Sequence, residues 1–88
     1  MTKIILPSVW AADGRTEFEG TEGLLPEVIE RFAADNPGFR RRLLGPDEQP
    51  LMYLNICVGD EMIPRHQRAT TMVEPGSTIT IIAPMAGG

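Results

Sequence analysis

The sequence predicts an α+β domain in which one face of a β-sheet packs on one main helix. A strongly amphipathic segment at residues 24–35 predicts the helix, and strand-like segments on both sides of it predict the sheet. The chain has 88 residues, which suffice for one hydrophobic core but not for two. Its 42% hydrophobic and 23% charged residues are ordinary values for a soluble globular protein.

The segment before the helix predicts a β-hairpin. Residues 3–6 are mostly aliphatic and predict a first strand, which Pro7 interrupts. Asp13-Gly14 is a strong turn signal, and residues 15–19 alternate in polarity as a second strand would. We therefore expect these two strands to pair with each other.

The helix is predicted by apolar residues at helical spacing on one side and charged residues on the other. Pro26 suits a first helical turn, where its missing N–H costs nothing, and Glu27 places negative charge at the positive end of the helix dipole. Asn36-Pro37-Gly38 should end the helix. The apolar stripe, which we expect to lie on the sheet, consists of Leu25, Val28, Ile29, Phe32 and Ala33.

The second half of the chain predicts the rest of the sheet. Pro64 cannot donate to a ladder, so the strand just before it should be short and lie at an edge. In the last strand we expect Ile79 and Ile81 to face the core. The expected elements are a helical turn at 39–44, a strand at 51–58, an edge strand at 62–63, a polar and irregular stretch at 65–71, and a last strand at 78–83.

The chain ends in a short tail after the last strand. Pro84 cannot continue the ladder, so we expect a domain at residues 1–84 and a flexible tail at residues 85–88, with an extended reach of roughly 14 Å. Gly87 and Gly88 lack a Cβ and can enter a channel too narrow for other residues. The tail would then deliver the α-carboxylate of Gly88. The alternative is an incidental ending, because termini are commonly loose and rich in small residues.

Charge and composition exclude several classes of protein. The net charge of −4 argues against a nucleic-acid partner, and no apolar run approaches the ~20 residues that a membrane span requires. The N-terminus does not resemble a secretory signal, and a single cysteine, Cys57, fits a reducing cytoplasm. The one basic cluster, Arg40-Arg41-Arg42, fits a solvated patch better than an anion or partner site.

The sequence predicts no catalytic or metal site of a conventional kind. His66 has no nucleophile and carboxylate pattern beside it, and Cys57 has neither a helix N-terminus nor a basic neighbour. One cysteine and one histidine cannot supply the usual four ligands of zinc. Met62 and Met85 are candidates for a partner contact, although core filling is the default for methionine. These features favour a carrier or a modifier over an enzyme.

The carboxylate of Gly88 can react only with help from a partner, because hydroxide is a poor leaving group. A mixed anhydride with AMP would activate it, and sulfide or a persulfide could then replace AMP to give a thiocarboxylate. Gly87 and Ala86 would let the tip thread into the partner's site. The chain itself would bind no cofactor, and ATP would be used by the activating partner.

Three segments resemble the ThiS/MoaD family of ubiquitin-like sulfur carriers. Leu25-Pro26-Glu27-Val28-Ile29 matches the start of the family helix, and residues 53–61 are similar to a family strand and turn. The most specific segment is the end of the chain, residues 78–88. Its Pro-x-Ala-Gly-Gly ending is similar to that of mycobacterial carriers for cysteine biosynthesis and of natural-product carriers.

The resemblance implies a β-grasp fold, a mixed sheet of four to five strands packed on one helix with the first and last strands side by side. It implies that an E1-like enzyme adenylates Gly88, and that the resulting thiocarboxylate donates sulfur to a biosynthetic acceptor enzyme in a cysteine, cofactor or secondary-metabolite pathway. Partners would dock on apolar residues of the sheet surface. The alternatives are the small subunit of molybdopterin synthase, a protein modifier joined through Gly88 to lysines, and a passive binding module.

Overall fold

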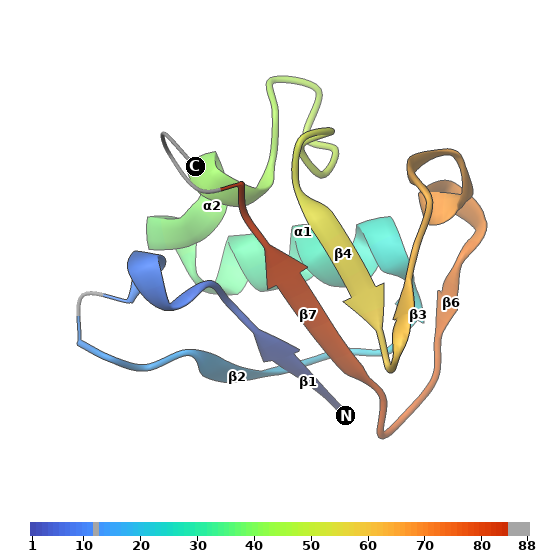
Figure 1. Ribbon diagram of the computed structural model, residues 1–88, viewed down its shortest axis with the longest axis horizontal. Helices are drawn as coiled ribbons and strands as arrows, with labels where there is room; N and C mark the ends of the chain where they lie inside the picture. The colour runs from blue at the N-terminus through green and yellow to red at the C-terminus, as the bar shows by residue number, and fades with distance from the viewer. Residues whose placement is uncertain (12, 85–88) are drawn as a thin grey trace.

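A computed structural model of the chain describes residues 1–11 and 13–84. It contains a five-stranded sheet in the order β2-β1-β7-β4-β5, with α1 lying across one face (Figure 1). β1 and β7 are parallel neighbours, and the other pairs are antiparallel. This arrangement confirms the predicted β-grasp fold. The elements of this layer are β1 (Thr2–Ile5), β2 (Glu17–Gly20), α1 (Leu25–Asp35), β4 (Asn55–Val58), β5 (Glu61–Met62) and β7 (Thr78–Ile82).

The hydrophobic core lies between the sheet and α1. The strands bury alternate residues against the helix, as the polarity pattern predicts: Ile4 from β1, Ile56 from β4, and Ile79 and Ile81 from β7. The predicted stripe of α1 is buried in full. The helix ends at Asn36, whose backbone N–H and side-chain amide both donate to the carbonyl of Phe32, at 2.9 and 3.1 Å.

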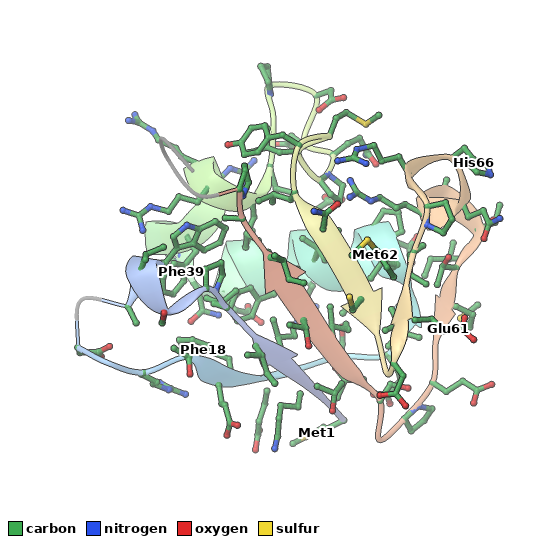
Figure 2. All side chains as sticks on the ribbon, viewed as in Figure 1. Met1, Phe18, Phe39, Glu61, Met62 and His66 are labelled. Atoms are coloured by element: carbon green, nitrogen blue, oxygen red, sulfur yellow. The ribbon has the colours of Figure 1, made fainter. Side chains whose placement is uncertain are left out.

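Three aromatic rings close one end of the core. Phe18 from β2 contacts Phe32 of α1 and Phe39 edge to face, with ring centroids 5.4 and 5.6 Å apart. Phe39 ends a 3₁₀ turn, η2 (Pro37–Phe39), which leads into the short helix α2 (Arg40–Leu43). Figure 2 marks Phe18 and Phe39 on the same side of the domain. The expected helical turn at 39–44 is thus present, with Leu43 and Leu44 buried.

Apart from shifts of one or two residues at the ends of strands, the structure differs from the predicted elements at four places. β4 begins at Asn55 because residues 51–54 form a turn, in which the Leu54 N–H donates to the Leu51 carbonyl at 3.2 Å. The stretch predicted as irregular forms a 3₁₀ helix, η3 (Arg65–Thr70). Another 3₁₀ turn, η1 (Ser8–Trp10), follows Pro7. The sequence did not predict the small sheet of β3 (Gly23–Leu24) and β6 (Met72–Val73), whose strands have two residues each.

Candidate functional site

The sheet topology gathers several segments around the point where β7 ends. β1 runs parallel to β7, with Ile5 opposite Thr80, so the residues that follow both strands emerge at the same end of the sheet. β4 runs antiparallel, with Asn55 opposite Ile82, so the segment before β4 also lies there. We call this region the exit end. It comprises η1, α2, the turn at residues 51–54, and Ile82 to Pro84; Figure 1 shows α2 and the loop before β4 beside the end of β7.

β7 fixes the starting point of the predicted tail. It lies between β1 and β4 and is bonded to both, and its Ile79 and Ile81 are buried in the core. Pro84 is the last described residue and is exposed. The predicted site residues of the tail lie outside the described part of the chain, so their roles stay predictions: Met85, Ala86, Gly87 and Gly88.

Large apolar side chains are exposed at the exit end. Met52 is 64% exposed and Tyr53 is 56% exposed, although the sequence placed both inside a strand. Ile82, the cross-strand partner of Asn55, is 41% exposed, and Val9 is exposed on η1. Burial of an apolar group stabilises a protein or a complex, and a partner that covers these side chains would gain that free energy. Exposed apolar side chains that gather in one region therefore commonly mark an interaction surface. The available signal in the sequence was the run of four large apolar residues at 51–54, directly after the loop at 45–50.

The arginines predicted as a solvated patch lie on α2, also at the exit end. Arg40 forms an ion pair with Glu48 of the following loop. The guanidinium of Arg42 lies over the ring of Trp10, 5.8 Å from its centroid, and Arg41 is exposed. Only Arg41 therefore extends into solvent without a defined neighbour among the described residues.

Two arginines of η3 contact the backbone of the 51–54 turn. Arg68 of η3 is buried, and its guanidinium donates to the Leu51 carbonyl at 3.1 Å and to the Leu54 carbonyl. The exposed Arg65 donates to the carbonyl of Met52. Burial of the guanidinium, together with the positive charge of Arg65, lowers the pKa of Arg68. Sequence reasoning missed this contact because it joins residues more than a dozen positions apart.

The open face of the sheet, opposite α1, carries the predicted contact residue Met62. Cross-strand partners share a face, so Ile5, Thr80, Cys57 and Met62 form one row from β1 to the edge strand β5. Met62 is 56% exposed at the end of this row, while the other three are half-buried (Figure 2). Its contact with a partner stays a prediction, but the position leaves it accessible.

Residues that could perform conventional chemistry lie apart from one another. His66 is exposed on η3 (Figure 2), whereas the half-buried Cys57 lies in β4. Across residues 1–11 and 13–84, no three His, Cys, Asp or Glu side chains are grouped to hold a metal ion. A hollow of about 730 Å³ lies beside β1 and β2, and neither Cys57 nor His66 lines it. Within the same ranges, no helix is both long and apolar enough to cross a bilayer.

The sheet order and the helix position define a small ubiquitin-like β-grasp protein. The chain belongs to the ThiS family, whose model matches residues 10–88. No curated protein sequence matches it significantly.

Three solved structures share the fold along almost the whole chain. One is a chain of the BexX/CysO complex of Amycolatopsis orientalis, with a TM-score of 0.80 and 23% identity, covering 100% of both chains. The second is CysO of Mycobacterium tuberculosis, described as an antigen, with a TM-score of 0.79 and 21% identity, covering 97% of this chain and 100% of that one. The third is SAMP1 of Haloferax volcanii, with a TM-score of 0.77 and 14% identity, covering 99% and 98%.

Proposed function

We propose that this protein is a sulfur carrier, and not itself a catalyst, whose working group is the carboxylate of Gly88. An E1-like enzyme would transfer AMP from ATP to this carboxylate and release pyrophosphate. Sulfide would then attack the acyl carbon and displace AMP, leaving a thiocarboxylate. A persulfide on the partner would instead displace AMP to give an acyl disulfide, and a second thiol of the partner would cleave its S–S bond, releasing the thiocarboxylate and forming a disulfide on the partner. An acceptor enzyme would take the sulfur for a biosynthetic product.

One observation carries the proposal: the strand that leads to Gly87-Gly88 lies in the middle of the sheet, bonded on both sides. A tail attached there begins at a strand that hydrogen bonds hold on both sides. Docking of the domain on a partner would therefore also fix where the tail begins relative to the partner's active site. Membership in the ThiS family supports the same function. The two-protein complex that contains one of the similar structures supports the expectation of a protein partner.

Intact-mass spectrometry tests the proposal directly. The protein is incubated with a candidate E1-like enzyme, ATP and a sulfide source, and its mass should increase by one exchange of oxygen for sulfur. A variant that lacks Gly88 should show no shift, and omission of ATP should abolish the shift of the native protein. Circular dichroism should show that the deletion leaves the fold intact, because the deleted residue follows the described domain.

Different products would select the alternatives. High-mass conjugates on lysines that disappear when Gly88 is deleted would favour a protein modifier. A stable complex with a larger chain that forms a pterin product would favour molybdopterin synthase. Unchanged function after replacement of both Gly87 and Gly88 would leave only a passive binding module.

A further inference from the structure

We propose that the turn at residues 51–54 is a docking element for the adenylating enzyme, which binds Met52 and Tyr53 while the tail enters its active site. We call these four residues the docking turn. The inference rests on the proposed function, since it names the surface through which the activating partner would recognise the carrier.

The docking turn is built to present two side chains outward. Its end residues point into the protein, because Leu54 is fully buried and Leu51 packs against the core. Its middle residues, Met52 and Tyr53, are both more than half exposed. Tyrosine and methionine are enriched in protein interfaces, and tyrosine is among the residues that contribute most to binding. The turn therefore combines firm anchoring with the kinds of side chain that partners bind.

The backbone of the docking turn is held by contacts from two other parts of the fold. The Leu51 N–H donates to the carbonyl of Leu43 at 2.9 Å, which ties the turn to α2. From η3, Arg68 donates to the carbonyls of Leu51 and Leu54, and Arg65 donates to that of Met52. A surface that is already ordered loses less conformational entropy on binding. The arginines of η3 thus act as positioning residues for Met52 and Tyr53.

The docking turn lies next to the route of the tail. Asn55, the residue after the turn, is the cross-strand partner of Ile82, which is two residues before Pro84. Ile82 is itself partly exposed and extends the apolar surface toward the tail. A partner that binds the turn would hold the tail at a high effective concentration near its own active site, so two weak contacts would reinforce each other.

The charges around the docking turn indicate the chemistry of the partner. Arg41 and Arg42 precede it on α2, and Arg65 contacts it from η3. In the described ranges, none of these three lies within ion-pair distance of a carboxylate, although the chain has a net charge of −4. These three arginines outnumber the acidic residues of the loop before the turn, where Glu48 is paired with Arg40 and only Asp47 has no ion pair among the described residues. Such an excess of cations on an acidic protein suits an acidic surface around an apolar recess. We therefore assign the turn to an enzyme surface of that kind, rather than to the same turn of a second copy, because pairing two docking turns would bring their arginines together.

The test is the concentration dependence of ATP–pyrophosphate exchange, catalysed by the E1-like enzyme that produces the mass shift. Replacing both Met52 and Tyr53 with Ala should raise the KM for the carrier at least tenfold and leave kcat within twofold, because docking is lost and the tail chemistry is intact. The matched control is Met72→Ala, which removes an equally exposed methionine, 59% exposed, from β6 and should leave KM unchanged.

Each outcome separates the inference from the proposed function. Exchange with the native chain but an unchanged KM for the double variant would overturn the docking turn alone, as would an equal effect of Met72→Ala. A defect only in sulfur delivery to the acceptor would overturn the assignment to the adenylating enzyme. No exchange and no mass shift with the native chain would overturn both proposals.

A second measurement needs no variant and guards against a folding defect. Titration of the native, isotope-labelled protein with the enzyme should broaden or shift the backbone amide signals of Met52, Tyr53 and Ile82 before those of Met72. Selective changes on β3 and β6 with none in the docking turn would overturn the inference.

Discussion

Replacing the buried Arg68 with Met is the most informative test of how the second half of the domain is held together. The Ile56 carbonyl of β4 accepts a hydrogen bond of 2.9 Å from the N–H of Ile63, the residue directly after β5. The Leu54 carbonyl lies two residues earlier and accepts from the Arg68 guanidinium. Carbonyls two residues apart on a strand point the same way, and Leu54 directly precedes β4, so its carbonyl lies where the row of acceptors on this side of the strand would continue. Arg68 therefore takes the place of a strand donor where β5 is absent.

The expected cost follows from the donors that remain. In Arg68→Met the Leu51 carbonyl keeps its bond from the Leu54 N–H, but the Leu54 carbonyl loses its charged donor, worth about 1.5–3 kcal/mol. Part of this cost is offset, because the buried Nε of Arg68 has no partner among the described residues and the charge is desolvated. We expect a net loss of about 1–2 kcal/mol in the free energy of unfolding, out of about 4–13 kcal/mol for a domain of this size.

Urea unfolding, followed by the fluorescence of the single Trp10, measures this loss. The midpoint should fall while the m-value stays constant, and the melting temperature should fall by about 4–16 °C. The control is Arg65→Met, whose exposed guanidinium also donates to the turn; water can replace it there, so we expect a change below about 0.5 kcal/mol. If the two variants are equally stable, the account of Arg68 as a substitute strand donor is wrong.

Two further substitutions test the core and the backbone by the same denaturation assay. Ile79→Ala should cost about 2–5 kcal/mol, because Ile79 is fully buried in β7, and a loss below 1 kcal/mol would contradict the central place of this strand. Gly76→Ala should cost about 1–2 kcal/mol, because Gly76 has φ +86° in the turn before β7. Gly38→Ala meets open space at an ordinary φ and should be neutral, so equal costs for the two glycine variants would refute the explanation from backbone angle.

Local patterns were sufficient to predict the main elements. The stripe of α1 keeps helical spacing from Leu25 to Ala33, and each of its predicted members is buried. β7 alternates in polarity, which correctly predicts that Ile79 and Ile81 face inward. The β1–β2 hairpin was predicted from its turn signal, and the pairing of β1 with β7 from the family resemblance.

The features that were missed depend on distant contacts. Residues 53–58 alternate, and the predicted strand was extended back to Leu51, but Leu51 to Leu54 turn instead because Leu43 and Arg68 offer partners for their backbone. β3 and β6 have two residues each, too few for a period to be recognised, and they pair across almost fifty residues. The burial of Arg68 gave no local signal, because its acceptors are backbone carbonyls that any sequence would provide.

The parallel pairing of β1 with β7 also determines how the domain resists force. A force applied to the chain beyond Pro84 acts along β7, and therefore across the hydrogen bonds that join β7 to β1 and β4. Such a load shears all of those bonds together and does not peel them one after another. We therefore expect the domain to stay folded when a partner applies a pulling force to its C-terminal segment.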